Sequence, residues 1–235
     1  MKCDCDEFVS PNSSVSSVCL RDLRVFHGVG DSDFKRFGSI GVRKVFCPGE
    51  ALFVQGDPVH EVFAVKSGRI RLSKVLEDGT EITLDYRKAG DLVGEEAFSH
   101  SVNYPLTAWA MEETMTCGFR VRDFNRLILD NPDLGLKLIG NMSSRIQSLN
   151  ARLETASAGN LEDRVFRILS TIASEHGRKT SKGYSIAFPL THEELSYLVG
   201  AHRVSVTRAL KRLREVGKVV KEDNRFIVPV LVAQE

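Results

Sequence analysis

The chain has 235 residues, of which 42% are hydrophobic, enough for one large or two modest domains with apolar cores. Its 32 Lys and Arg residues nearly balance its 31 Asp and Glu residues, so the net charge of +1 points to no class of partner. No apolar run approaches the roughly 20 residues that cross a bilayer, and no basic stretch followed by an apolar one opens the sequence. We therefore expect a cytoplasmic protein without a membrane partner.

The first 20 residues form a polar segment that we call the leader, and it holds three of the five cysteines, Cys3, Cys5 and Cys19. A structural disulfide is not expected in a reducing cytoplasm, so clustered thiols indicate metal ligands or redox-active groups. Four cysteine thiolates can bind an iron–sulfur cluster. Exposed thiols near bases such as Lys2 and Arg21 would instead suit a thiol–disulfide switch.

Residues 21–130 carry a pattern of short strands. From Val45 to about Phe119, apolar runs alternate with turn glycines at positions 49, 56, 68, 79 and 90. Asp78-Gly79 between strand-like flanks is a strong hairpin signal. Strands at this regular spacing predict a small antiparallel barrel or roll.

Residues 131–158 show the period of a helix. Asn131-Pro132 marks its start, because proline suits the first helical turn. Five apolar residues follow at alternating steps of three and four, namely Ile139, Met142, Ile146, Leu149 and Leu153. Such a narrow seam between polar flanks favours packing against a partner helix, as in a homodimer, over a place in the chain's own core.

Residues 159–235 are expected to form a separate domain after a break at Ala158-Gly159-Asn160. A helix begins near Leu161 and ends at Gly177, followed by a loop over residues 178–185. Thr191 and Glu194 have the spacing of a capping box at the start of a short helix. Gly200 then supplies the tight turn of a helix-turn-helix.

The second helix of this motif is predicted from about Arg203 to Val216, with Val206, Leu210 and Leu213 buried. Within residues 203–221 seven basic side chains stand against Glu215 alone. A local basic stripe on a neutral protein is typical of a nucleic-acid-binding module, although a solvated helix face would look similar. The segment after Gly217 alternates like a two-stranded wing around Asp223-Asn224.

These features predict binding to double-stranded DNA. The start of a recognition helix enters the major groove, where guanidinium groups bind guanine and other side chains contact phosphates. The candidate contact residues are Thr191, His202, Arg203, Val204, Ser205, Arg208, Lys211 and Arg212. An enzyme is not indicated, since the sequence has no glycine-rich phosphate loop, no H-E-x-x-H motif and no nucleophile elbow.

Three stretches, "PGEALFVQGDPVHEVFAVKSGRIRL", "DGTEITLDYRKAGDLVGEEAF" and "THEELSYLVGAHRVSVTRALKRL", resemble transcription regulators of the Crp/Fnr superfamily. The resemblance covers nearly the whole chain. It implies an α+β protein with an N-terminal antiparallel β-roll of the cyclic-nucleotide-binding kind, a long dimerisation helix and a C-terminal winged helix-turn-helix. A homodimer on a two-fold operator is then expected, with RNA polymerase as a further partner if the protein activates.

The recognition helix departs from the family's common pattern of arginine, glutamate and a second arginine. Arg203 and Arg208 match the two arginines, but Val204 stands at the glutamate position. Valine cannot accept a hydrogen bond from cytosine, although it can contact a thymine methyl group. "RVSVTR" is closer to the cyanobacterial nitrogen-control regulator, so we expect altered base identity at this position of each half-site.

The resemblance also places an effector pocket in the roll, formed by Gly94, Glu95, Glu96, Leu106 and Thr107. Glu95 matches a ribose-binding glutamate and Thr107 a phosphate-contacting hydroxyl. Leu106 replaces the arginine that binds the phosphate, which argues against cyclic AMP because a buried phosphate loses its charged partner. A different small effector remains open. Cys47-Pro48 resembles a Cys-Pro haem motif, but this dipeptide is more simply a small residue before the first turn.

The segment "EETMTCGF" places Cys117 where the fumarate-and-nitrate-reduction regulators have the fourth ligand of their cluster. The resemblance therefore implies a [4Fe–4S] cluster on Cys3, Cys5, Cys19 and Cys117. The leader spacing, C-x1-C-x13-C, is not the C-x2-C-x5-C of those regulators. A thiol–disulfide switch, known among homologues with a lone cysteine near position 19, remains the alternative.

Overall fold

The computed structural model describes residue 26 and residues 40–99, 102–157 and 159–229, with the side chains of residues 148 and 151–157 left out. The chain divides into two compact units, Met1–Ser144 and Arg145–Glu235. The division falls inside one long helix, so the domain boundaries expected at residues 20, 130 and 158 remain predictions. We describe each unit by itself.

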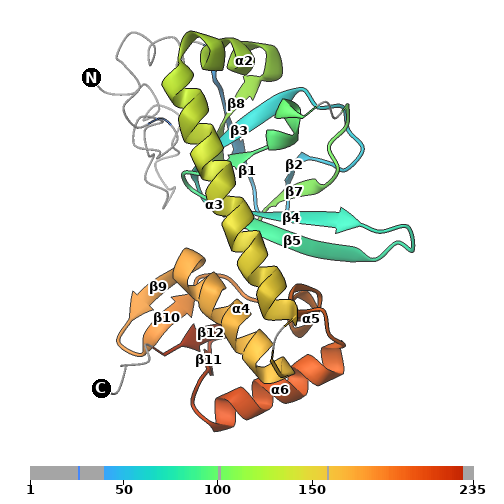
Figure 1. The fold of residues 1–235 in the computed structure, drawn as a ribbon, viewed down its shortest axis with the longest axis vertical. Helices are drawn as coiled ribbons and strands as arrows, with labels where there is room; N and C mark the ends of the chain where they lie inside the picture. Colours follow the sequence, from blue (N-terminus) through green and yellow to red (C-terminus); the bar gives the residue numbers. More distant parts are fainter. Residues whose placement is uncertain (1–25, 27–39, 100–101, 158, 230–235) are drawn as a thin grey trace. The chain divides into compact units, whose positions relative to one another are not determined.

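The N-terminal unit contains eight strands within its described residues (Figure 1). They are β1 (Val42–Phe46), β2 (Ala51–Phe53), β3 (Glu61–Ser67), β4 (Arg69–Val75), β5 (Glu81–Lys88), β6 (Leu92–Val93), β7 (Thr107–Ala110) and β8 (Thr114–Arg120). Two four-stranded sheets result, in the orders β1-β8-β3-β6 and β2-β7-β4-β5, and their strand pairs are antiparallel. The predicted antiparallel roll is confirmed.

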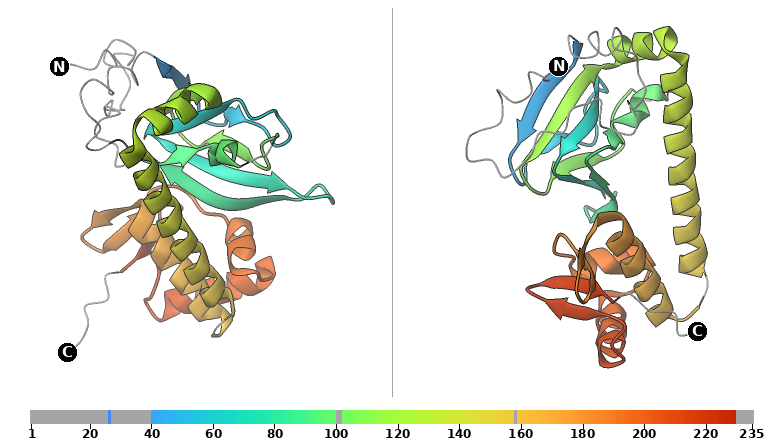
Figure 2. Two further views of the ribbon diagram at one scale, coloured as in Figure 1. Left: turned by 45° about the horizontal axis from the view of Figure 1, so that its top comes forward. Right: turned by 90° about the vertical axis from the view of Figure 1, so that its left-hand side faces the viewer.

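The predicted glycine turns are also confirmed. Gly49, Gly56, Gly68, Gly79 and Gly90 all have φ between 82° and 97°, the left-handed region that suits glycine. The β4–β5 hairpin closes around Asp78-Gly79, with Val75 paired to Glu81, and projects as a long ribbon in Figure 2. Each apolar run therefore ends where glycine lets the chain reverse.

Two apolar clusters hold this unit together. One lies between the two sheets and includes Phe46 and Phe63 of the first sheet with Phe53 and Ile70 of the second. The other lies between the first sheet and the helices that follow it, α2 (Val121–Asp130) and the start of α3 (Pro132–Ser157). Helix α3 begins at Pro132, as the sequence predicts. A short 3-10 helix, η3 (Glu95–Phe98), follows β6.

The C-terminal unit packs helices on a small sheet. Its described elements are α4 (Leu161–His176), β9 (Gly177–Thr180), β10 (Gly183–Ile186), α5 (His192–Val199), α6 (Arg203–Glu215), β11 (Val220–Glu222) and β12 (Arg225–Val228). The four strands form an antiparallel sheet in the order β11-β12-β10-β9. Val165, Ile168, Leu169 and Ile172 of α4 are buried as predicted, whereas Leu161 is only half-buried.

The sequence prediction of a loop over residues 178–185 is wrong. Residues 177–186 form the β9–β10 hairpin, in which Lys179 pairs with Tyr184. The β9 strand has no alternation of apolar and polar residues because its side chains at positions 178–180 are exposed. Gly183, with φ of 134°, follows the turn and lies so close to the Val228 carbonyl that a side chain there would collide with it.

Candidate functional site

The helix-turn-helix is built by local interactions that the sequence encodes. The Thr191 side chain accepts a hydrogen bond from the Glu194 amide at 3.0 Å, and the Glu194 carboxylate accepts one from the Thr191 amide at 2.8 Å. This capping box starts α5, and Gly200, with φ of 62°, ends it. Both predictions are confirmed. Together they set the direction in which α6 leaves the turn.

Helix α6 presents one buried and one exposed face. Val206, Leu210 and Leu213 are buried as predicted, and Ala209 joins them. The exposed face carries the candidate contact residues Arg203, Val204, Arg208 and Lys211, whereas Ser205 is half-buried. His202 caps the helix, since its Nδ1 accepts a hydrogen bond from the Val204 amide at 3.3 Å. A basic exposed face at a helix N-terminus can contact both base edges and phosphates.

Arg212 is paired with a residue of another helix in its own unit, whereas Lys211 pairs within α6, with Glu215 at 3.9 Å. The Nη1 of Arg212 lies 2.6 Å from Glu162 Oε1 at the start of α4. The hydrogen bond from this guanidinium to the carboxylate, and the negative charge of Glu162, raise the pKa of Arg212. Sequence reasoning could not find the pair, because the two residues are 50 positions apart. The predicted DNA contact of Arg212 would have to compete with Glu162.

Two further residues of this surface were missed. His192 Nδ1 lies 2.9 Å from the Thr207 hydroxyl, which joins α5 to α6. Partial burial, followed by the positive charges of Lys221, Arg203 and Arg214, lowers the pKa of His192. Basic side chains of α6 and β11 thus add positive charge near the His192 imidazole. Positive charge on this surface favours the approach of DNA phosphates.

The wing forms as predicted, with β11 and β12 joined by Asp223 and Asn224, both at positive φ (45° and 63°). A shallow groove of about 440 Å³ lies between the wing and the β9–β10 hairpin. It is lined by Thr180, Ser181, Lys182, Ser185, Glu222, Asp223, Arg225 and Ile227. Lys182 and Glu222 form an ion pair, so the wing and the hairpin are joined by charge.

The predicted effector pocket contains an ion pair that the sequence did not reveal. Gly94, with φ of 87°, turns the chain into η3 and brings Glu95 back over the roll. The Glu95 carboxylate lies 2.9 Å from Nη2 of Arg87 on β5, and Nη1 of Arg87 pairs with Asp85. The Arg87 side chain is only 6% exposed. The buried guanidinium of Arg87 thus binds the Glu95 carboxylate, the group to which the resemblance assigns ligand binding.

Thr107 and Leu106 of the predicted pocket also interact with other residues of the protein. The Thr107 hydroxyl accepts a hydrogen bond from the Gln55 amide at 2.9 Å, and Leu106 packs against the cluster between the sheets. Burial, followed by the negative charge of Glu95, raises the pKa of Glu96. Glu95 and Thr107, two of the residues predicted to hold an effector, therefore have partners within the protein.

The predicted metal ligands are divided between described and undescribed residues. Cys3, Cys5 and Cys19 lie outside the described residues. Cys117 lies on β8, the last strand of the roll, and is 2% exposed. Its Sγ approaches Gly41 so closely that a Cβ there would lie 2.5 Å away. Within the described part of the chain, no three His, Cys, Asp or Glu side chains are placed to bind a metal.

Cys117 is positioned among aromatic residues. Its cluster includes Phe119 and Phe124, with ring centroids 5.4 Å apart, and Phe26 from the N-terminal segment. Cys47, by contrast, is an exposed free cysteine. Burial shields the Cys117 thiol from water while keeping it in the same cluster as Phe26, the only residue before position 40 that the structure describes. The structure thus shows the Cys117 thiol shielded from water, and its role as a cluster ligand stays a prediction.

The dimer seam on α3 is exposed. Ile139, Ile146 and Leu149 are between 50% and 64% exposed, and Met142 is half-buried. The Leu153 side chain lies outside the described ones. The same helix buries Leu134 and Leu138 against the roll, so its apolar residues serve two faces. A row of three exposed aliphatic side chains on one helix is typical of an interface, which supports the predicted partner helix.

Comparison with known proteins identifies two domain families in the chain. Residues 43–131 match the cyclic nucleotide-binding domain, and residues 163–231 match the Crp-like helix-turn-helix domain. The Global nitrogen regulator of Synechococcus elongatus is 25% identical over 199 residues, covering 80% of this chain and 86% of the relative. The Anaerobic regulatory protein of Bacillus subtilis is 24% identical over 222 residues, covering 94% and 89%.

A solved structure shows the same architecture. A transcriptional regulator of the CRP family from Thermus thermophilus superimposes with a TM-score of 0.67 at 25% identity, covering 81% of this chain and 93% of its own. Among the described residues, no helix is both long and apolar enough to cross a membrane. The chain is a Crp/Fnr family DNA-binding transcription regulator, with a cyclic nucleotide-binding domain followed by a Crp-like helix-turn-helix domain.

Proposed function

We propose that the protein is a homodimer that binds a two-fold operator and changes its operator affinity in response to a redox or gas signal, such as oxygen, nitric oxide or an oxidant. The signal would be received by Cys3, Cys5 and Cys19 of the leader together with Cys117, holding a [4Fe–4S] cluster. Four thiolates are the ligand set of such a cluster, whose loss or conversion would supply the redox chemistry. The change in operator affinity that follows would be carried by residues of the chain itself.

The observation that carries this proposal is the burial of Phe26 in the same apolar cluster as Cys117. Six residues lie between Cys19 and Phe26, and the seven Cα–Cα steps between the two span at most about 25 Å when extended. A chain held at Phe26 therefore keeps Cys19 within reach of β8. The name of the Bacillus subtilis relative, an anaerobic regulatory protein, points to the same kind of signal.

The exposed seam of α3 supports the dimer on which the response depends. Two copies of the row formed by Ile139, Ile146 and Leu149 would bury each other in an antiparallel or parallel helix pair. A two-fold dimer presents its two α6 helices to half-sites about 34 Å apart, one turn of DNA. A small change in how the two α3 helices pack would alter that spacing and hence the operator affinity.

The test of the signal is anaerobic purification, assay of iron and acid-labile sulfide, and operator binding before and after exposure to air. Cys117→Ser should remove the cluster and the response to air. Cys47→Ser is the matched control, since Cys47 is exposed and lies outside the proposed ligand set. An iron-free wild-type protein whose operator binding ignores both air and reductant would exclude a cluster and a disulfide switch alike.

A thiol–disulfide switch is separated from a cluster by the same samples. It would give iron-free protein whose operator binding still changes with dithiothreitol. Its oxidised form would weigh about 2 Da less for each bond, because forming a disulfide releases two hydrogen atoms.

The operator's base preference depends on Val204, which is exposed on α6. We expect Arg203 and Arg208 to contact guanine and Val204 to contact a thymine methyl group. Val204→Glu should therefore change the base selected at one position of each half-site. Val216→Glu makes the same chemical change at an exposed position beyond the end of α6 and should leave the selected sequence as it is. An unchanged selection for Val204→Glu would refute the assignment.

A second candidate signal is a small effector other than cyclic AMP, bound in the roll where Arg87, 6% exposed, pairs with Glu95, which the resemblance assigns to ligand binding. Such a ligand would have to exchange with, or bind beside, this pair. Native mass spectrometry of the freshly purified protein tests it. A bound mass that is lost in Arg87→Met would support this alternative, and a mass equal to that of two chains without a ligand would count against it.

A further inference from the structure

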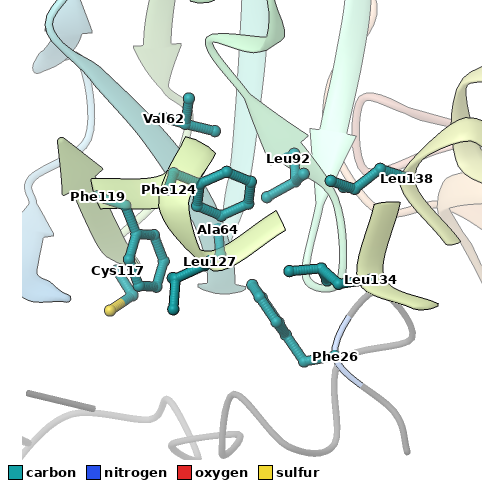
Figure 3. Packing of buried hydrophobic residues seen from close by; sticks show 10 residues of the cluster. All are labelled: Phe26, Val62, Ala64, Leu92, Cys117, Phe119, Phe124, Leu127, Leu134 and Leu138. Atoms are coloured by element: carbon teal, nitrogen blue, oxygen red, sulfur yellow. The ribbon is translucent and has the colours of Figure 1, made fainter. Parts of the chain in front are cut away.

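Phe26 is the one residue before position 40 that the structure describes, and its side chain is completely buried. Figure 3 shows it pointing into a cluster made by the roll and the two following helices. The other buried members are Val62, Ala64, Leu92, Cys117, Phe119, Phe124, Leu127, Leu134 and Leu138. A residue 16 positions before the first strand of the roll thus completes one of its two cores.

The cluster that receives Phe26 is built by strands of the roll and by the helices that follow them. Strand β8 supplies Phe119, whose ring centroid lies 6.2 Å from that of Phe26. Helix α2 supplies Phe124, and the first turns of α3 supply Leu134 and Leu138. Phe98 of η3 continues the row, 5.5 Å from Phe124. The cluster therefore touches the strand of Cys117, the predicted effector loop and the helix that carries the dimer seam.

We infer that Phe26 is the anchor by which the N-terminal segment docks on its own roll, and the positioning residue that couples this segment to the start of α3. The coupling to a signal rests on the proposed redox function. The docking itself rests only on the burial of Phe26 in the cluster.

The coupling follows from close packing. Protein interiors are packed like solids, so the space that an aromatic ring occupies cannot be emptied without movement or a cavity. Leu138 faces the cluster, and Ile139, the next residue on the same helix, belongs to the exposed seam. A displacement of Leu138 must therefore move Ile139. Any event that displaces Phe26 would therefore act on the seam through Leu138 and the peptide bond that joins it to Ile139.

The docking is tested by hydrogen exchange on the full-length protein. Phe26→Ala should speed exchange at the amides of residues 136–142 at least about tenfold, because local opening of α3 becomes easier. Phe46→Ala is the matched control, since it makes the same change in the other cluster of the same roll. It should leave these amides within about twofold of wild type. Equal exchange in Phe26→Ala and wild type would overturn the inference.

Phe26→Leu is a second variant that keeps the inference testable if Phe26→Ala does not fold. Leucine keeps the site apolar and fills part of it, so about threefold faster exchange of the same amides is expected. If Phe26→Ala is unfolded and Phe26→Leu exchanges like wild type, the anchor role is refuted.

The coupling is tested by the ratio of operator affinities before and after air exposure. Phe26→Ala should bring this ratio close to one, whereas Phe46→Ala should keep the wild-type ratio at a lower melting temperature. A folded Phe26→Ala protein with the wild-type ratio would refute the coupling. If wild-type binding itself ignores air, the proposed redox function fails, and the exchange experiment still decides whether Phe26 docks the segment.

Discussion

Replacement of Arg87 on β5 is expected to destabilise the roll strongly. Its guanidinium bonds two carboxylates at once, Glu95 on η3 at 2.9 Å and Asp85 on its own strand. Its Nε is buried and has no hydrogen-bond partner among the described residues. Arg87→Met keeps much of the length and apolar stem of the side chain but removes the charge. Both carboxylates then lose this cation.

The magnitude follows from the burial of the three groups. Removing one partner of a buried ion pair costs about 3–5 kcal/mol, because an uncompensated charge stays in the interior. Arg87 is 6% exposed, but Glu95 and Asp85 keep 22% and 23% of their side-chain surface in water. Water stabilises the stranded carboxylates in part, so we expect a loss of about 3 kcal/mol. For a unit of this size this lowers the melting temperature by about 9 °C.

Calorimetry of the full-length protein measures the loss as a shift of one of its unfolding transitions. Arg71→Met is the matched control, because Arg71 pairs with Glu81 at 3.2 Å with both side chains more exposed, and its loss should cost less than about 1 kcal/mol. Glu95→Gln combined with Arg87→Met should recover part of the stability, since it removes one stranded charge. Equal small losses for Arg87→Met and Arg71→Met would refute the reasoning.

Three further outcomes are expected. Thr191→Ala breaks the capping box and should destabilise the C-terminal unit by about 1 kcal/mol, measured by calorimetry and accompanied by weaker operator binding; no change would contradict the capping role. Glu96→Gln should raise the melting temperature at pH 7. Burial, followed by the charge of Glu95, raises the pKa of Glu96, so the unfolded state ionises first and the folded state loses stability as pH rises above the ordinary carboxyl pKa. The gain should vanish near pH 4, and a pH-independent gain would exclude this origin. Arg208→Gln should lower operator affinity and its salt dependence more than Arg212→Gln, because Glu162 already neutralises Arg212; equal effects in salt titrations would show that DNA displaces Glu162.

Local signals explain what the sequence predicted correctly. The capping box at Thr191, the left-handed glycines of the roll and the start of α3 at Pro132 each depend on residues a few positions apart. The buried triad of α6 follows from helical periodicity. Such features are decided before the chain packs, so pattern and turn chemistry suffice to find them.

The missed features depend on contacts between distant residues. Arg87 and Glu95 are only eight positions apart, but β6 and the turn at Gly94 lie between them, so the fold alone shows that η3 returns to Arg87. Glu162 and Arg212 are 50 residues apart, and Phe26 and Phe119, whose rings are in contact, are 93 positions apart. The β9–β10 hairpin was missed for a different reason, since its exposed strand has no apolar alternation. Because tertiary packing creates these contacts, no local sequence pattern could predict them.

The central claim is that the leader cysteines and Cys117 make operator binding sensitive to redox state. The most direct measurement is the operator affinity of anaerobically purified protein before and after air exposure, with iron and acid-labile sulfide determined on the same samples. We predict about four iron and four sulfide per chain before exposure, as a [4Fe–4S] cluster requires. We also predict an affinity change of at least about tenfold afterwards, with both properties lost in Cys117→Ser and kept in Cys47→Ser. Iron-free protein with the same affinity in air, nitrogen and reductant would contradict the account.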